Sequence, residues 1–351
     1  MSVEFIIDSQ NGEIIHKNKK IVEELTEQFL TKELQLTDDR PDLPIVPDKI
    51  LRDYAKFWKY AGGVAHPRKR DKNKRPIRVL KPAWYQIKFA NMNHGVWLSS
   101  NKMGKTMGES INDFRTRLMP EHAGFDVLLV GQNQLIADQH LLDLKVWVLG
   151  SEKLAPYLIT KPNRRFQLPE QKSKMSQMYI ENPYNPEKPS RIIAIGFSES
   201  LAYSWKNIDR LHISDPAMIA RRDQLSFFSG LYSRLSNTGG DIKIEGVAGQ
   251  RIGYFWELCK TIFHLENKFE LADEHKLEEF ASMTKFESLF TTADDGVKEG
   301  IISKEYLDFA RSIMTEDEFK RIYYGEFAKP EGAIFGDWKV GTHQPLGLDQ
   351  L

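Results

Sequence analysis

The chain has 351 residues, 41% of them hydrophobic, and its 49 Lys and Arg residues balance 49 Asp and Glu residues. This length allows one large core or two smaller ones, and the balanced charge means that any nucleic-acid contact must come from a local patch. The single cysteine, Cys259, excludes an internal disulfide framework and a four-cysteine metal site, and it fits a reducing cytoplasm. We find no signal-peptide pattern and no apolar run of 18 residues, so the sequence predicts an intracellular protein that does not span a membrane.

Residues 1–60 predict a small α/β extension ahead of the main domain. Val3–Ile7 and Glu13–His16 are short apolar-rich runs with an Asn-Gly pair between them, which predicts a β-hairpin. Apolar residues at helical spacing predict helices over residues 19–35 and roughly 48–60, joined by a proline-rich linker. No motif marks this region, so it fits either a docking module or a plain extension.

From about residue 80 the chain alternates between strand-like apolar runs and amphipathic helical stretches. This alternation predicts a mainly parallel sheet with helices on both faces. The predicted strands are Val96–Leu98, Asp126–Val130, Arg191–Ile195, Ile208–Ser214 and Asp241–Val247. The predicted helices run from the loop after Leu98 to about Leu118 and over Gln132–Val148, and helical periodicity returns over Ser303–Phe319.

The strongest local signal is the octapeptide Ser99–Thr106, SSNKMGKT, which we call the phosphate loop. A standard phosphate-binding loop reads GxxxxGK[ST]; Gly104, Lys105 and Thr106 fit, while Ser99 replaces the first glycine. The glycine lets backbone N–H groups approach the phosphates, the lysine reaches the β- and γ-phosphates, and the threonine hydroxyl ligates Mg²⁺. The apolar strand before the loop and the long helix after it favour a nucleotide site over an ordinary strand-to-helix turn.

Two further features fit a nucleotide site. The strand Ile208–Ser214 leads into Asp215, as in a Walker B element whose carboxylate holds Mg²⁺ beside the loop threonine. The alternative for Asp215 is a turn-forming Asp-Pro. Gln86 precedes Lys105 by 19 residues, and its amide can both donate and accept hydrogen bonds, as the edge of adenine requires. The alternative for Gln86 is a solvated helix residue.

In this order, the features resemble the large terminase subunits of tailed viruses, the motors that pump DNA into capsids. The family's adenine motif and deviant Walker A are similar to PAWYQ and VWLSSNKMGKT, and its Walker B region is similar to IDRLHISDPAMIARRD. The segment DIKIEGVAGQRIGYFWELCK occupies the place of the family's coupling motif. The segment with which these ATPase domains end resembles RIYYGEFAKPEGAIF. The resemblance covers about residues 80–338 and implies a P-loop NTPase fold of the RecA/ASCE-like type.

The resemblance also implies a domain organisation. We expect an N-terminal extension over residues 1–60, a P-loop ATPase domain over residues 61–338 and a C-terminal tail over residues 339–351. Large terminase subunits normally carry a nuclease domain after the ATPase domain. The tail leaves no room for that domain, so we expect this chain not to cleave DNA.

By the same resemblance, ATP and Mg²⁺ are the expected cofactors. Gln86 is expected on the adenine side, and Mg²⁺ between Thr106 and Asp215. The expected catalytic residues are Lys105 and Asp215, with Lys102 as a charge-stabilising cation because the neighbouring Asn101 replaces an arginine common in the family. The loop residues expected to contact the nucleotide are Ser100, Asn101, Lys102, Met103, Gly104, Lys105 and Thr106.

The sequence departs from the family at the residue after Asp215. The family places a glutamate there to polarise the attacking water, whereas this chain has Pro216, which cannot act as a base. Either another carboxylate does that work or hydrolysis is slow. The candidate carboxylates are Asp223, Glu199 and Glu245, and the arginines available as a trans arginine finger are Arg210, Arg221, Arg222, Arg234 and Arg251.

The expected function is ATP-driven DNA translocation. The resemblance implies double-stranded DNA, a portal protein and a small terminase subunit as partners, and a homo-oligomeric ring with five subunits. It places the protein in the host cytoplasm and transiently at the procapsid portal. The basic run at residues 68–75 fits either DNA contact or a solvated loop. Two alternatives stay open: a nucleotide-binding structural or regulatory module, which Pro216 favours, and a helicase-type ATPase, which would need a second motor lobe.

Overall fold

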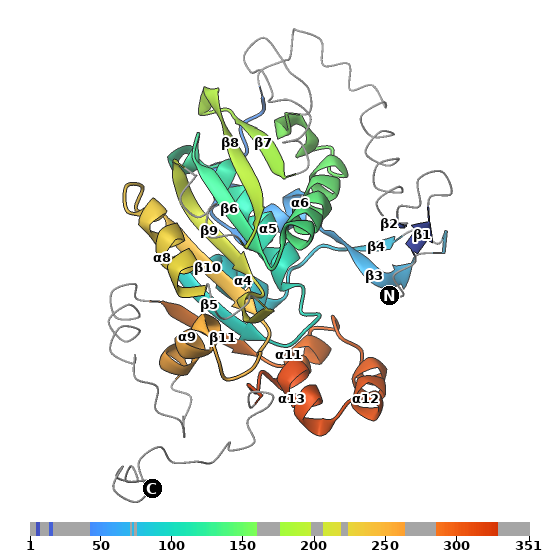
Figure 1. The fold of residues 1–351 in the computed structure, drawn as a ribbon. Helices are drawn as coiled ribbons and strands as arrows, with labels where there is room; N and C mark the ends of the chain where they lie inside the picture. Colours follow the sequence, from blue (N-terminus) through green and yellow to red (C-terminus); the bar gives the residue numbers. More distant parts are fainter. Residues whose placement is uncertain are drawn as a thin grey trace, which may run out of the picture.

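The computed structural model describes residues 5–7, 14–16, 43–70, 72–73, 76–159, 176–197, 206–218, 224–263 and 286–328. Its centre is a seven-stranded sheet in the order β11-β5-β10-β9-β6-β8-β7 (Figure 1). Neighbouring strands are parallel except for the antiparallel β7–β8 pair at one edge. The strands are β5 (His94–Ser99), β6 (Asp126–Gly131), β7 (Gln177–Asn182), β8 (Asn185–Gly196), β9 (Ile208–Ser214), β10 (Asp241–Gly246) and β11 (Glu287–Thr291). The predicted mainly parallel α/β sheet is confirmed.

Helices cover both faces of this sheet (Figure 1). In β6, Val127 and Leu129 join the core beneath α5 and α6, while Leu128 and Val130 join the core beneath α8 and α9. A strand buried on both faces reads as a continuous apolar run, which explains the DVLLV pattern. The helices are α4 (Trp84–Ala90), α5 (Lys105–Arg117), α6 (Gln134–Leu149), α8 (Gln224–Leu235) and α9 (Tyr254–Ile262), with short 3₁₀ turns at Pro120–His122, Ala155–Tyr157 and Pro216–Met218.

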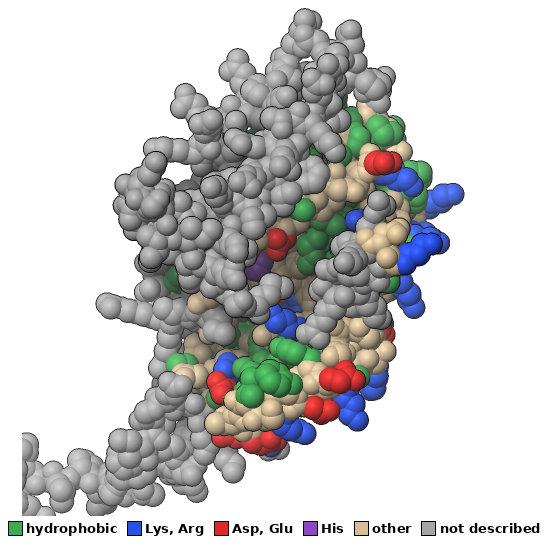
Figure 2. Space-filling view, turned by 90° about the vertical axis from the view of Figure 1, so that its right-hand side faces the viewer, with side chains coloured by type: hydrophobic (Ala, Val, Ile, Leu, Met, Phe, Trp, Pro, Cys, Tyr) green, Lys and Arg blue, Asp and Glu red, His purple; other side chains and the backbone are tan. Residues whose placement is uncertain are grey.

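A helical unit of α11 (Ala293–Lys298), α12 (Lys304–Ile313) and α13 (Glu316–Tyr324) follows the edge strand β11. The helical periodicity predicted over Ser303–Phe319 is thus present, and it belongs to two helices, α12 and α13. Thr315 ends the first helical pattern and caps the next helix, because its side chain accepts a hydrogen bond from the backbone N–H of Glu318. Figure 2 shows apolar side chains bordered by acidic ones at the bottom of the molecule, where this unit lies.

The N-terminal region contributes a hairpin and two short helices. Strands β1 (Phe5–Ile7) and β2 (Ile14–His16) pair antiparallel, which confirms the predicted hairpin, whereas the helix predicted over residues 19–35 lies outside the described residues. The predicted helix over 48–60 is divided into α2 (Asp48–Leu51) and α3 (Tyr54–Tyr60).

Helix α3 packs directly on α5. The Tyr54 hydroxyl is buried and donates a hydrogen bond of 2.6 Å to the carbonyl of Gly108. A second hairpin, β3 (Val64–Arg70) with β4 (Pro76–Val79), leads from α3 to α4 and contains part of the basic run. Among the described residues, no helix is long and apolar enough to cross a membrane.

Candidate functional site

The phosphate loop joins β5 to α5 at the carboxyl edge of the sheet. Gly104 has a φ of 70° and stands at the N-cap of α5, a left-handed conformation that glycine adopts without strain. Lys102 is also left-handed, with a φ of 64°, and its backbone N–H donates to the Asn101 side chain at 2.8 Å. The loop therefore delivers the N-terminus of a 13-residue helix to the sheet edge, where its free N–H groups suit a phosphate.

The helical unit and the edge strand hold the phosphate loop in place. The Ser100 N–H donates to the carbonyl of Thr291 at 3.1 Å, and the Asn101 N–H donates to the carbonyl of Ile322 at 2.9 Å. Met103 is fully buried and belongs to the same core as the helical unit. Its sulfur lies 2.7 Å from the position that a Cβ on Gly296 would occupy, so the two segments are in close contact. The loop and the helical unit therefore form one packed structure.

We expect Met103→Ala to destabilise the protein by about 2 kcal/mol, because it leaves a cavity between the phosphate loop and α11. Urea unfolding measures this loss. Met314→Ala is the matched control, since Met314 is only partly buried against the same core. Equal losses for the two variants would show that Met103 does not join the loop to the helical unit.

Lys105 and Thr106 begin α5 and point to the sheet edge. The Lys105 ammonium group lies 3.4 Å from the carbonyl of Ser100, so it reaches back over the loop. The Thr106 hydroxyl donates to Glu245 at 2.6 Å and lies 3.1 Å from the Ser214 hydroxyl. These contacts bring the loop threonine against the ends of β9 and β10.

Asp215 turns away from the line of β9. Its φ of 49° is left-handed, its backbone N–H donates to the carbonyl of Glu245 at 2.8 Å, and its side chain accepts from the N–H of Val247 at 3.3 Å. Burial raises the pKa of the Asp215 carboxyl; the positive charge of Lys105 opposes this rise and the negative charge of Glu245 adds to it. Asp215 thus lies in the same group of charges as Lys105, and its hydrogen-bond partners are the backbone groups of Glu245 in β10 and of Val247 just after it.

Gln86 lies against the phosphate loop. Its side-chain N–H donates to the carbonyl of Gly104 at 2.9 Å, and its side-chain oxygen accepts from the N–H of Ala83 at 2.9 Å. Only 7% of the residue is exposed, which contradicts the alternative of a solvated helix residue. The contact braces the loop, and one amide N–H remains for a further acceptor such as adenine.

An ion network of buried charges lies beneath the site, between α5 and the two central strands. His212 pairs with Asp113 at 2.7 Å and with Glu245 at 3.6 Å. Burial alone lowers the pKa of His212, but the two carboxylates outweigh burial and raise it to about 10. Burial raises the pKa of Glu245, but His212, Lys105 and Thr106 outweigh burial and hold it below its ordinary value. Glu245 is therefore an ionised carboxylate that is completely buried.

Period-2 spacing could have revealed the ion network. Polar residues alternate with apolar ones in the buried strands IDRLHIS and DIKIEG, which places Arg210 and His212, like Lys243 and Glu245, on one face of the sheet. Charged residues at such positions require partners, because an unpaired buried charge is costly.

Several predicted candidates are not brought to the site. Arg210 is 4% exposed and is paired with Asp241 at 2.5 Å and Glu109 at 3.3 Å, so it is not available as an arginine finger. Arg251 donates to the carbonyl of Phe327 at 3.1 Å, and Arg234 lies on α8. The remaining candidates lie outside the described residues: Asp223, Glu199, Arg221 and Arg222.

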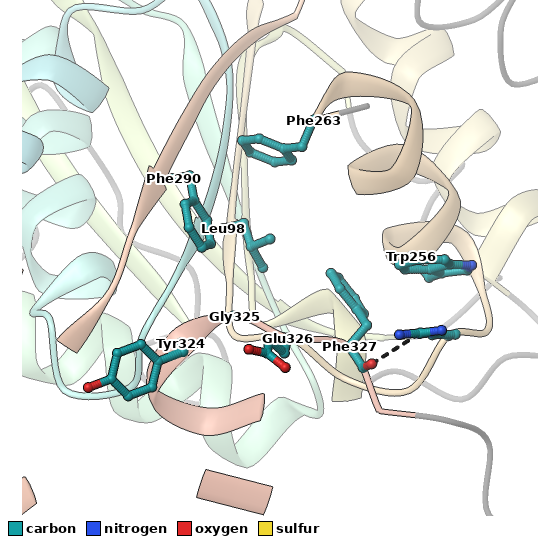
Figure 3. Close-up of a pocket in the computed structure, with 9 residues that line it drawn as sticks. Leu98, Trp256, Phe263, Phe290, Tyr324, Gly325, Glu326 and Phe327 are labelled. Carbon is teal, nitrogen blue, oxygen red and sulfur yellow. Dashed lines mark hydrogen bonds between the residues drawn. The ribbon is translucent and has the colours of Figure 1, made fainter. Parts of the chain in front are cut away.

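The segment in the place of the coupling motif pairs with the end of the described chain. The Ala328 N–H donates to the carbonyl of Gly249 at 2.9 Å, and the Arg251 N–H donates to the carbonyl of Ala328 at 2.8 Å. Beside this pairing lies an apolar cavity of about 390 Å³. Figure 3 shows the side chains that line it. No residue of the phosphate loop lines it, so its chemistry is separate from that of the phosphate site. It is lined by Leu98, Arg251, Trp256, Phe263, Phe290, Tyr324, Gly325, Glu326 and Phe327.

The described residues contain no group of three or more His, Cys, Asp or Glu side chains able to hold a metal ion. Mg²⁺ in nucleotide sites takes only one or two protein ligands together with phosphate oxygens and water. The arrangement of Thr106, Glu245 and Asp215 fits such a site, because it offers a hydroxyl and two carboxyl groups beside the phosphate loop.

The parallel sheet, the phosphate loop before α5 and the acidic groups at the ends of β9 and β10 define the P-loop NTPase fold. More narrowly, the chain has the fold of a large terminase ATPase domain. That of Thermus phage P74-26 superimposes with a TM-score of 0.50 at 14% identity, covering 78% of this chain and 98% of that domain.

Two longer structures are also similar. The large terminase of a thermophilic bacteriophage, in complex with ADP, has a TM-score of 0.47 at 11% identity and covers 70% of this chain. The large terminase of bacteriophage HK97 has a TM-score of 0.47 at 11% identity and covers 77%. This chain spans 53% and 55% of the length of those proteins. Comparison with protein-family models gives no match, and comparison with curated proteins gives none either.

Proposed function

We propose that this protein is the ATP-driven motor domain of a DNA-packaging machine of the large terminase type, with MgATP bound at the phosphate loop. The observation that carries the proposal is the hydrogen bond of 2.6 Å between Thr106 and Glu245. It joins a GKT loop to a carboxylate at the end of the adjacent parallel strand, which is the juxtaposition that a Mg²⁺-nucleotide site requires.

The residues of the site have separate roles in binding MgATP. Backbone N–H groups at the start of α5 bind the phosphates, Lys105 reaches their oxygens, and Gln86 fixes the loop and contacts adenine. Lys102 is exposed on the loop and supplies a second cation. Bound Mg²⁺ would neutralise phosphate charge next to Thr106. Two carboxyl groups lie there, Asp215 and Glu245, and the family resemblance alone assigns the metal to Asp215.

The partners follow from the same proposal. The motor acts on double-stranded DNA in a ring of five subunits docked on a portal protein, together with a small terminase subunit, in the host cytoplasm. The helical unit supports a subunit contact, because Phe309 and Ile313 of α12 are 60% and 62% exposed, one helical turn apart. A nucleotide-binding module without turnover is the second candidate, and the proline after Asp215 is the observation that favours it.

The test is Mg²⁺-dependent ATP hydrolysis at high protein concentration, with and without linear double-stranded DNA. We expect turnover that DNA stimulates and that EDTA removes. A triplex-displacement assay on the same samples reports translocation. ATP binding without turnover in any of these conditions would favour the nucleotide-binding module, and strand separation without triplex displacement would favour a helicase.

A further inference from the structure

From the contacts of Thr106 we infer that the carboxylate holding Mg²⁺ in this site is Glu245 of β10, and that Asp215 after β9 serves the reaction in another way. The inference rests on the proposed function, because a metal site here has a use only with bound nucleotide. It differs from the assignment by resemblance, which gives the metal to Asp215. Two geometric observations carry it: strand register and one unpaired oxygen atom.

Strand register decides which side chain meets the loop threonine. Ser214 and Glu245 are paired across β9 and β10, so their side chains lie on the same face of the sheet, toward the start of α5. Both contact the Thr106 hydroxyl, at 3.1 and 2.6 Å. On β9, the residue beside Thr106 is thus Ser214, whose side chain is neutral. The negative charge beside Thr106 comes from Glu245 on the neighbouring strand β10.

Asp215 lies one residue beyond the position on β9 that contacts Thr106, which Ser214 occupies. Successive residues of a strand point to opposite faces, and the left-handed turn at Asp215 carries its backbone out of β9. Its side chain instead accepts from the N–H of Val247, beyond the end of β10. Relative to Ser214, Asp215 therefore takes the position of the residue that follows the metal-binding position of a Walker B strand, where a carboxylate can polarise the attacking water.

Glu245 has the charge that a metal site needs. It is completely buried, yet it faces His212 at 3.6 Å, and His212 is in turn paired with Asp113 at 2.7 Å. The side chain of His212 and the hydroxyl of Thr106 therefore both approach the same oxygen, Oε1, of the Glu245 carboxyl group. A buried, ionised carboxylate is costly unless its oxygens have partners.

One oxygen of that carboxylate is unused. Within the described residues, Oε2 of Glu245 has no hydrogen-bond partner, although Oε1 accepts from Thr106. Buried polar atoms are rarely left unpaired, and in the described part of the chain the Nε2 atom of the neighbouring His212 has no hydrogen-bond partner either, so there is room here for a water molecule or an ion beside the phosphate loop. A hydrated divalent cation at the phosphate loop satisfies this atom with water donors or by direct coordination, and it offsets the local negative charge of Glu245 and Asp215.

The test measures the affinity of a fluorescent, non-hydrolysable ATP analogue in Mg²⁺ and in EDTA. For the unmodified protein we expect tighter binding in Mg²⁺. Glu245→Gln should lose this metal-dependent gain, measured as the ratio of the affinities in Mg²⁺ and in EDTA, by roughly 10- to 100-fold. Asp215→Asn should keep the gain but lose ATP turnover. Electron paramagnetic resonance of Mn²⁺ added with the analogue gives a second readout, with the bound signal lost only in Glu245→Gln.

Glu109→Gln is the matched control, since Glu109 is a buried carboxylate of the ion network that bonds Asn112 and Arg210, and its metal-dependent gain should persist. A gain that survives in Glu245→Gln but not in Asp215→Asn would overturn the inference and leave the proposed function intact. If the unmodified protein does not bind the analogue, the proposed function fails. If Glu245→Gln does not fold, Glu245→Asp is the deciding variant. Its shorter side chain moves the carboxylate away from Thr106, so we expect a smaller gain in affinity from Mg²⁺. A gain as large as that of the unmodified protein would contradict the inference.

Discussion

ATP hydrolysis is expected to fall at least about 100-fold in Lys105→Ala, while the fold is retained. The Lys105 ammonium group donates a hydrogen bond of 3.4 Å to the carbonyl of Ser100, a long contact, so its removal leaves little unsatisfied. Without the Lys105 ammonium group, the β- and γ-phosphates lose the cation at the first residue of α5. Neighbouring Lys102 does not replace it, because Lys102 is exposed and its backbone turns in the left-handed conformation.

Phosphate release at saturating ATP measures this loss. Lys88→Ala is the control, because Lys88 is exposed on α4, next to the site but outside the phosphate loop, and its removal should leave turnover unchanged. Circular dichroism confirms that both variants fold. Turnover in Lys105→Ala equal to that of the unmodified protein would show that hydrolysis does not pass through this loop.

Asp209→Asn is expected to lower the free energy of unfolding by about 3–5 kcal/mol, because it leaves a buried arginine without its counter-charge. Arg117 at the end of α5 is completely buried and contacts Asp209 of β9 at 2.5 Å, and His122 contacts the other carboxylate oxygen at 2.7 Å. This pair fixes the C-terminal end of the helix whose N-terminal end carries the phosphate loop. Since whole proteins are stable by only about 5–15 kcal/mol, the loss is large.

The effect of Asp209→Asn depends on pH in a defined direction. Burial raises the pKa of Asp209, but Arg117 and His122 outweigh burial, and the pKa lies below its ordinary value. The carboxylate therefore stabilises the fold above the unfolded pKa of about 4, and this contribution is lost as pH falls through the lower pKa of the folded state. The difference between variant and unmodified protein should be fully present above about pH 4 and should shrink as pH falls below that value.

Urea unfolding at several pH values measures this dependence. Asp48→Asn is the matched control, since Asp48 pairs with Arg52 at the surface, with side chains that are 66% and 52% exposed. Exposed pairs contribute about 0–1 kcal/mol, so the control should change stability little. A loss in Asp209→Asn no larger than in the control would contradict the assigned role of the Arg117 pair.

Local sequence determined the helices and strands that have a clear hydrophobic periodicity or a recognisable motif. The run DVLLV is apolar on both faces and became the interior strand β6, and the GKT end of the phosphate loop became the start of α5. Such elements depend on periodicity and on backbone preferences within a few residues. Where that signal is weak the prediction was incomplete. Strand β11 was not predicted, because it has alternating exposed residues at the sheet edge, and the boundary between α12 and α13 was not predicted, because it depends on the cap at Thr315.

The site itself was determined only in part by the sequence. The phosphate loop, Gln86 and Asp215 were identified from local motifs, and the structure brings Gln86 to Gly104 and Asp215 into the field of Lys105. The contact between Thr106 and Glu245 joins residues 139 positions apart and depends on β10 lying between β5 and β9. Only the tertiary structure decided this contact, because strand order and register arise from the packing of the whole sheet and not from any local pattern.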